Sequence, residues 1–300
     1  MPHLAEALGR GEDARLLIIH ADDMGMCHSA NAASIAALAA GTVSCGSVMV
    51  PCPWFAPLAA WARAHPDVDL GVHLTLTSEW ETYRWGPVAP VTRVPSLVDP
   101  DGFLWRSVAD VVAHARPEEV AIELSAQIER ARRFGLRPTH VDSHMGTLFA
   151  DRRFFDAYLA AAEAADIPPM LVAPSPEIAQ LARALGLDAP ARLDALCSRG
   201  FFFLDRIHLG LRAETLADRS AALREALRQL TPGVTELIVH LAGDEPEIRE
   251  ITRAWRARYD EFRLFTDPQV RAWIEEEGIE LIGYRELARL WRRQGRAADR

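Results

Sequence analysis

The sequence predicts an α/β fold: a single irregular (β/α) barrel of about seven parallel strands, with a doubly wound open sheet as the alternative. Strand-like and helix-like segments alternate along the chain, and right-handed βαβ crossovers of this kind close into a parallel sheet or barrel. The 300 residues contain no linker or low-complexity break, and one α/β barrel can have this length. We therefore expect residues 1–300 to form one barrel domain, with loop or lid insertions near residues 78–115 and 173–213.

Seven segments have the pattern of strands, because they are short, apolar and rich in β-branched residues. The first contains an uninterrupted apolar run from Leu16 to Ile19, which is typical of a buried strand. The expected strands lie at residues 15–20, 42–50, 68–77, 138–144, 169–173, 235–240 and 279–283.

Helices are expected between these strands, and several carry boundary signals. Gly41 ends the first, Pro117 stands in the first turn of a later one, and Gly135 follows the end of that helix. The expected helices lie at residues 29–40, 54–65, 117–134, 151–166, 214–230, 247–262 and 268–277, with a last one beginning at residue 284.

The composition is typical of a globular protein and argues against several partners. Hydrophobic residues make up 49% and charged residues 25% of the chain. A formal net charge of −9 argues against nonspecific binding to nucleic acid or an anionic membrane. No apolar run is long enough for a membrane span, and the N-terminal segment lacks the pattern of a signal peptide. The four cysteines show no CxxC spacing, so we expect a reducing, cytoplasmic location.

Ionisable residues interrupt the apolar strands near their carboxyl ends. In parallel α/β folds this edge of the sheet carries the ligand site. Each residue alone has an ordinary explanation, since a single buried histidine is usually structural and neighbouring acids often cap a helix. Four strand ends would, however, each have to bury a charged group independently. The residues are Asp22 and Asp23 after the first strand, His73 in the third, the alternating His140, Asp142 and His144, and His240 after the sixth.

This set of residue types favours a metal-dependent hydrolase. One carboxylate and two imidazoles form a familiar facial set for a divalent metal with open positions. If one of the paired acids binds the metal, the other lies beside a water molecule and can act as its general base. A histidine on the far side, such as His240, can protonate a leaving group.

Four motifs, in this order, resemble those of the YdjC-like carbohydrate deacetylases of the ChbG and HpnK type. They are "LLIIHADDMGMCHSANAA", "GVHLTLT", "RPTHVDSHMGTLF" and "GVTELIVHLAG". The resemblance covers about residues 15–290. The family includes chitooligosaccharide deacetylases and is similar in design to the NodB-type polysaccharide deacetylases. The resemblance implies an irregular barrel that removes acetyl groups from N-acetylated amino sugars with one divalent metal ion. Two histidines and one carboxylate suit zinc, manganese, cobalt or, less well, magnesium, and we expect magnesium or zinc.

The resemblance also implies a role for each residue of the expected site. Asp23, His73 and His144 correspond to the metal ligands, and Asp22 corresponds to the catalytic base. His240 corresponds to the acid or transition-state partner. The two neighbouring acids would therefore have different tasks, one holding the metal and the other accepting a proton.

Further residues are expected around this site. Asp142 either orients a metal-binding histidine or makes a structural hydrogen bond. His20, like His28 and Asn31, flanks the acids and either tunes them or belongs to the helix start. Trp80 and Trp85, with Tyr83, lie in the irregular stretch beyond the His73 strand and either contact a sugar ring or cover the barrel mouth. We expect Arg253, Arg256 and Arg258 to form a solvated helix face.

The sequence departs from the family pattern at two places. Met145-Gly146-Thr147 stands where many members carry further histidines, and the segment from His240 to Gly243 alters a late "HPG"-like motif. These changes bear on the substrate more than on the reaction type.

The expected partner is an N-acetylated mono- or oligosaccharide, without nucleic acid. The alternatives are a metal-dependent hydrolase of another amide or ester and a non-catalytic carbohydrate-binding protein that retains the fold. If the chain self-associates, a homodimer is expected, because twofold dimers dominate soluble homo-oligomers.

Overall fold

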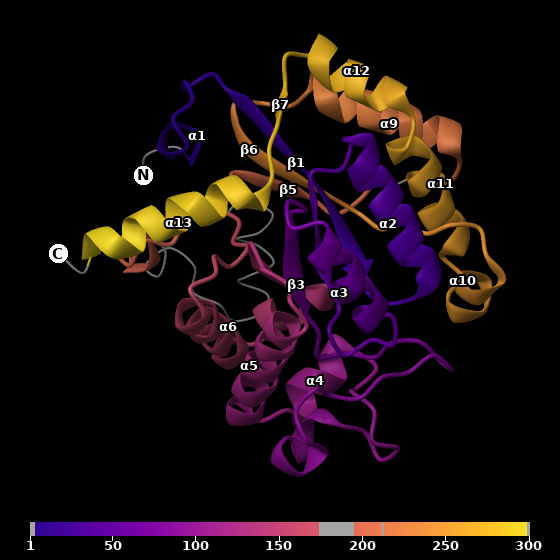
Figure 1. The fold of residues 1–300 in the computed structure, drawn as a ribbon, viewed down its shortest axis with the longest axis vertical. Helices are drawn as coiled ribbons and strands as arrows, with labels where there is room; N and C mark the ends of the chain where they lie inside the picture. The colour runs from indigo at the N-terminus through magenta and orange to yellow at the C-terminus, as the bar shows by residue number, and fades with distance from the viewer. Residues whose placement is uncertain (1–3, 174–194, 212, 299–300) are drawn as a thin grey trace.

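Seven strands form one parallel sheet in the computed structural model, which describes residues 4–173, 195–211 and 213–298 (Figure 1). The strand order is β4-β3-β2-β1-β6-β5, and β7 pairs with β1 outside this path. The strands are β1 (Arg15–Met24), β2 (Cys45–Val48), β3 (Leu70–Leu74), β4 (Val141–Ser143), β5 (Arg206–His208), β6 (Gly233–Val239) and β7 (Glu280–Leu281).

Strand β1 is the centre of the sheet. One edge pairs with β6 from Arg15 to Ala21. The other edge pairs first with β7, at Leu16 and Leu17, and then with β2 from His20 onward. The strand is buried from Leu16 to Met24, as its apolar sequence predicts, so polar side chains on it lie inside the protein.

The sheet curls into an irregular barrel. Isolated parallel bridges join Val141 to Pro169 and Val172 to Leu204, and so continue the sheet from β4 toward the segment that leads into β5. The predicted fold class, an irregular α/β barrel with parallel strands, is confirmed.

The helices surround the sheet (Figure 1). Helices α5 and α6 lie side by side on the β3–β4 side, and α9, α11 and α12 lie together on the β6 side. The helices are α1 (Leu4–Ala7), α2 (His28–Ala40), α3 (Phe55–Ala64), α4 (Val108–His114), α5 (Pro117–Arg133), α6 (Arg152–Ala165), α9 (Leu216–Arg228), α10 (Pro246–Ile251), α11 (Trp255–Phe265), α12 (Pro268–Glu276) and α13 (Tyr284–Ala298).

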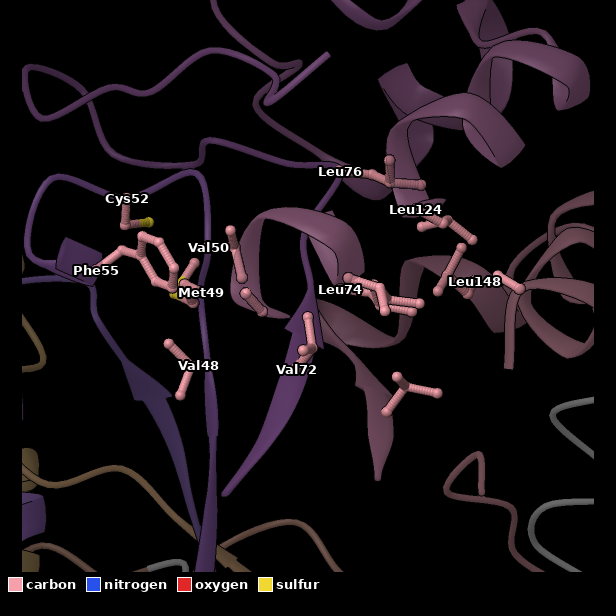
Figure 2. Packing of buried hydrophobic residues seen from close by; sticks show 14 of the residues in the cluster. Val48, Met49, Val50, Cys52, Phe55, Val72, Leu74, Leu76, Leu124 and Leu148 are labelled. Carbon is pink, nitrogen blue, oxygen red and sulfur yellow. The ribbon is translucent and has the colours of Figure 1, made fainter. Parts of the chain in front are cut away.

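Alternation along β3 separates the apolar core from the polar interior of the barrel. Val72 and Leu74 point outward and pack near Leu124 of α5 and Leu148 (Figure 2). Successive strand side chains point to opposite faces, so His73 between them points into the barrel. The apolar cluster therefore fixes the direction of the histidine.

The structure differs from the sequence predictions at several elements. Residues 169–173 make only isolated bridges, and the sheet gains β5 instead. The helix expected over 247–262 is broken into α10 and α11, because Thr252 is extended and its hydroxyl accepts the N–H of Ala254. Residues 78–115 contain α4 and two 3-10 helices, and residues 174–194 of the second expected insertion lie outside the described residues. No helix within the described residues has the length and apolarity needed to cross a membrane.

Candidate active site

A bulge at the end of β1 turns two neighbouring acids toward one site. The β1–β2 pairing runs from Ala21–Gly46 to Met24–Val48, so β1 has one extra residue at this point. Asp23 has a positive φ of 62°, in the left-handed region. Gly46 lies opposite, where an added Cβ would meet the Ala21 carbonyl oxygen at 2.7 Å. In a regular strand Asp22 and Asp23 would point to opposite faces, and the bulge removes that alternation.

Three atoms that can act as metal ligands, one each from Asp23, His73 and His144, lie close together at the carboxyl ends of the strands. Asp23 Oδ1 lies 3.3 Å from His144 Nδ1 and 3.6 Å from His73 Nε2. The two ring nitrogens lie 3.1 Å apart. All three residues are at most 4% exposed, and Asp23 Oδ1 is buried without a hydrogen-bond partner. An unpartnered buried carboxylate oxygen is costly, so a positive charge at this point, from a bound cation or from a proton on one of the histidines, stabilises the arrangement.

Each of the two histidines is oriented by a second carboxylate. His73 donates Nδ1–H to Asp142 Oδ1 over 2.9 Å, and His144 donates Nε2–H to Glu79 Oε2 over 3.2 Å. These bonds leave the lone pairs of His73 Nε2 and His144 Nδ1 directed at Asp23. Metal-binding histidines commonly donate their other N–H to a carboxylate in this way. The donor set, its spacing and its orientation therefore fit a divalent ion. Zinc binds histidine nitrogen and carboxylate oxygen near 2.1 Å, whereas magnesium prefers oxygen ligands and would keep several water molecules here.

The other oxygen of Asp23 pairs with an arginine from α11. Arg258 Nη2 donates to Asp23 Oδ2 over 2.6 Å, and Arg258 is only 8% exposed. Burial raises the pKa of Asp23, but the charge of Arg258 and contacts with His144 and His73 outweigh this and hold it well below its usual range. The prediction of a solvated face was therefore wrong for Arg258, although Arg253 and Arg256 are exposed.

Asp22 divides its two oxygens between the interior and the site. Its Oδ1 accepts Nδ1–H of His20 over 2.6 Å. Its Oδ2 faces His73 Nε2 at 3.8 Å and His240 Nε2 at 3.9 Å. His240 follows β6, and its backbone N–H donates to Glu261 Oε2 of α11 over 2.7 Å. Desolvation in this setting lowers the pKa of His240.

The rim of the site is built by His240 and by the turn after His144. The His240 side chain is 38% exposed and Met145 is 49% exposed. Met145 and Gly146 both have positive φ values, 53° and 64°, so the chain turns sharply away after the third ligand position. A surface cavity of about 280 Å³ lies elsewhere, at the beginning of β3, and is lined in part by Arg63.

The aromatic residues expected at the mouth pack differently from one another. Trp85 is 3% exposed and donates Nε1–H to the carbonyl oxygen of Thr77, which favours the role of a loop hydrophobe. Trp80 is half-buried and packs against the apolar core. Tyr83 donates its hydroxyl to the carbonyl oxygen of Met26. All three lie in a stretch that α5 anchors, because Glu123 accepts the N–H groups of residues 88 and 89.

His28 and Asn31 do not contact the two acids. His28 pairs with Glu245 over 3.0 Å and lies against Trp54. Asn31 accepts the N–H of Gly25 over 2.6 Å and donates to the carbonyl oxygen of Trp54. These contacts fix the turn that follows β1, so they favour the local structural explanation.

Comparison with known proteins agrees with this geometry. A model of the family described as YdjC-like protein matches residues 16–276 of the chain. This chain belongs to the YdjC-like family.

Individual YdjC-like relatives match over nearly their whole length. A carbohydrate deacetylase of Thermus thermophilus is 33% identical, over 91% of this chain and 94% of the relative. A chitooligosaccharide deacetylase of Serratia marcescens is 28% identical, over 91% of this chain and 99% of the relative. A solved structure from Enterococcus faecalis, of a protein described as a candidate for cellobiose-phosphate cleavage, superposes with a TM-score of 0.77 at 27% identity and covers 91% of this chain and 99% of that one.

Sequence reasoning missed three groups of this YdjC-like site. Glu79 lies in an irregular segment with no periodic signal. Arg258 and Glu261 lie on α11, on the face that buries Leu264 and Phe265. Arg258 stands seven residues before Phe265 and three before Glu261, so a helical-face analysis of α11 could have found both charges on the buried side.

Proposed function

We propose that this chain is a metal-dependent carbohydrate deacetylase that hydrolyses the N-acetyl group of an amino sugar, with the barrel as its single catalytic domain. The observation that carries the proposal is the buried, unpartnered Asp23 Oδ1 facing the lone pairs of two oriented histidines. A second carboxylate, Asp22, lies beside this cluster with one oxygen directed at it. The two neighbouring acids thus have separate environments and separate tasks.

Asp23, His73 and His144 would hold the divalent ion. When bound, the ion supplies a positive charge that polarises the acyl carbonyl group and acidifies water. Asp142, Glu79 and Arg258 act on the ligand side chains and keep their donor atoms in place.

Asp22 and His240 would move the protons of the reaction. Hydrolysis adds the hydroxyl of water to the acetyl carbon, breaks the C–N bond and requires one proton on the departing nitrogen. Asp22 Oδ2 accepts the proton that water loses, and His240 delivers one to the amine. His240 Nε2 lies 3.9 Å from Asp22 Oδ2, beyond direct hydrogen-bond distance, so the proton would return from the base to the acid through one bridging water molecule. The products are acetate and a free amino sugar.

The names of the relatives support the substrate class. Proteins that match this chain over about nine-tenths of its length are named carbohydrate deacetylase or chitooligosaccharide deacetylase. The exposed rim, with His240 and Met145, leaves the site accessible to a substituent of a larger sugar. We expect an N-acetylated mono- or oligosaccharide to bind with its acetamide group at this rim.

The test is acetate release from a panel of N-acetylated mono- and oligosaccharides, with and without added zinc or magnesium. We expect release that depends on the ion and is lost in Asp22→Asn and in His144→Ala. The matched control is Asp67→Asn, which makes the same chemical change at an exposed position. Bound metal, measured in each variant, should be retained in Asp22→Asn and lost in His144→Ala.

Two outcomes would overturn the proposal. Undiminished release by the Asp22→Asn variant would remove Asp22 from the reaction. No release from any acetylated sugar, by protein that holds one ion per chain, would favour a different amide or ester substrate or a binding role.

A further inference from the structure

Behind Asp22 lies a second histidine pair that the proposed reaction does not use. His20 and His140 are fully buried, at 0% exposure. His20 Nδ1 lies 2.6 Å from Asp22 Oδ1, and His20 Nε2 lies 2.8 Å from His140 Nε2. Asp22, the proposed base, is therefore hydrogen-bonded to a series of side chains that leads into the barrel and away from the metal-ligand cluster.

The chain continues through Thr139 and ends at the backbone. His140 Nδ1 lies 3.1 Å from Thr139 Oγ1, and the Thr139 hydroxyl donates to Asp69 Oδ1. The other oxygen of Asp69 accepts the backbone N–H of Arg285, at the start of α13, over 2.7 Å. Asp69 precedes β3, whereas Asp22 lies at the end of β1, so the chain of hydrogen bonds runs along the interior of the barrel.

Asp69, at the far end of this hydrogen-bonded series, sets the direction of every hydrogen bond in it. The Asp69 carboxylate only accepts, so Thr139 donates to it and accepts from His140 Nδ1–H. His140 Nε2 then carries a lone pair and accepts from His20 Nε2–H. His20 therefore donates from both ring nitrogens and is an imidazolium. Burial opposes this charge, but the hydrogen bond and charge of Asp22, with Glu236 and Asp142, raise the pKa of His20 to about 9.

The surrounding backbone and side chains make room for the second ring. A Cβ on Gly71 would lie 2.5 Å from the His140 ring, so only glycine leaves space for the imidazole there. On another side the His140 ring stacks on Tyr284, with centroids 3.8 Å apart and planes at 20°. The His140 ring is thus held in one place, and it holds the His20 ring in turn.

We propose that His20 is a positioning residue for Asp22: it holds Oδ1 from the interior, so that Oδ2 faces the reacting groups, and His140 fixes the ring of His20. This inference rests on the proposed function, because it assumes that Asp22 is the base. A carboxylate with both oxygens free to rotate would spend part of its time turned away from the substrate. A displacement of about 1 Å in a reacting group can lower a rate by about 100-fold.

A second metal site is the competing explanation for this cluster. His20, His140 and Asp142 lie close enough together to be considered as ligands. However, His20 Nε2–H donates a hydrogen bond to His140 Nε2, and the two oxygens of Asp142 accept hydrogen bonds from His73 and Ser47. The cluster is satisfied by its own hydrogen bonds, unlike Asp23 Oδ1.

The test compares His20→Phe with His20→Asn. Phenylalanine fills the space without a donor, whereas the asparagine amide can place an N–H near the position of Nδ1. We expect His20→Phe to lower kcat by about 100-fold, with KM and bound metal unchanged, and we expect His20→Asn to recover most of that loss. Equal losses in the two variants, or an unchanged kcat in a folded, metal-loaded His20→Phe protein, would overturn the proposal.

A double-mutant cycle separates positioning from a general structural effect. If His20 acts through Asp22, adding His20→Phe to Asp22→Asn produces no further loss of the residual kcat, which is measured at high enzyme concentration. Additive losses would show that His20 acts elsewhere. Undiminished activity of Asp22→Asn alone would instead refute the proposed function, and the inference about His20 with it.

Gly71→Ala provides a second route if His20→Phe does not fold. The new Cβ displaces the His140 ring while leaving every member of the chain in the sequence. We expect a fall in kcat that is smaller than that of His20→Phe, without loss of metal. The matched control is Gly11→Ala, at a position where an added Cβ meets no atom within 4 Å. A Gly71→Ala variant with normal kcat would overturn the role of His140.

Discussion

The barrel contains two pairs of neighbouring histidines that are almost identical as ring pairs and different in chemistry. His73 and His144 have ring centroids 5.0 Å apart with planes at 72°, and His20 and His140 have centroids 4.9 Å apart with planes at 70°. Both pairs are buried. Ring geometry therefore does not decide which pair could bind an ion.

The two pairs differ in the side chain that lies beside them and in the number of N–H donors available to satisfy their acceptor atoms. With both rings neutral, as a bound ion requires, the His73–His144 pair directs two lone pairs at Asp23 Oδ1, a third acceptor, and no other side chain donates to that oxygen. In the His20–His140 pair one ring donates to the other, and the outer nitrogens reach Asp22 and Thr139. The first pair needs a cation from outside, whereas the second is complete. An unsatisfied acceptor is thus a better sign of a ligand site than a cluster of histidines.

The largest expected effect comes from removing the third acceptor. Asp23→Ala should abolish metal binding and, with it, acetate release, because two neutral histidines alone hold a divalent ion weakly. Thr139→Val changes the other pair by removing the hydroxyl between His140 and Asp69, and it should leave one ion per chain bound. Metal analysis of both purified proteins decides the comparison.

The Thr139→Val variant should still be destabilised, since a buried nitrogen and a buried carboxylate lose a partner. Leaving a buried polar group unsatisfied costs about 1–3 kcal/mol. Loss of metal in Thr139→Val, or retention of metal in Asp23→Ala, would show that the two pairs are not separate in function.

The two pairs should also respond differently to pH when metal is added. Burial opposes protonation of His144, but the charges of Glu79 and Asp23 raise its pKa to about 9 in the metal-free protein. Its protonated form therefore stabilises the metal-free fold fully below about pH 6.5, and this stability is lost as pH rises through 9. A metal ion must displace this proton. We expect the dissociation constant for zinc to fall by about tenfold per pH unit between 6.5 and 8.5 for each proton displaced.

Thermal unfolding of metal-free and metal-loaded protein over the same pH range provides the check. The pKa of His20 is also raised to about 9 in the metal-free protein, but His20 is not a proposed ligand, so the ion does not have to displace its proton. The gap in Tm between the two forms should therefore widen with rising pH. A gap that is constant from pH 6.5 to 8.5 would contradict the proton–metal exchange at His144.

The sequence was sufficient to predict the residues at the strand ends, because topology brings the carboxyl ends of parallel strands to one edge. Asp22, Asp23, His73 and His144 come together as that rule requires. Alternation along "THVDSH" correctly predicted one shared face, since His140, Asp142 and His144 all have partners inside the barrel. Short-range periodicity and fold topology were enough for these residues.

The rest of the site depends on contacts that periodicity does not encode. Arg258 reaches Asp23 across 235 positions of the sequence, from a helix that reads as charged and solvated. The β1 bulge that turns both acids inward depends on the register with β2. Strand β5, Arg206–His208, is too short and polar to be recognised, and its place in the sheet comes from pairing with β6.

Substitution of Arg258 has the smallest expected effect of these tests, and it acts only on the His73–His144 pair, through Asp23. Arg258→Met keeps the length and burial of the side chain but removes the donor to Asp23 Oδ2, so the carboxylate is free to turn. Partners behind a metal ligand are typically worth about 10–100-fold in affinity, and we expect zinc binding to weaken by about tenfold.

The control is Arg253→Met, an exposed arginine just before α11. Because Arg258 does not touch His20 or His140, kcat at saturating zinc should remain within a small factor of the original, whereas the proposed His20→Phe effect persists at any zinc concentration. If excess zinc fails to restore the Arg258→Met protein, Arg258 acts on the reaction itself rather than on the ligand that it holds.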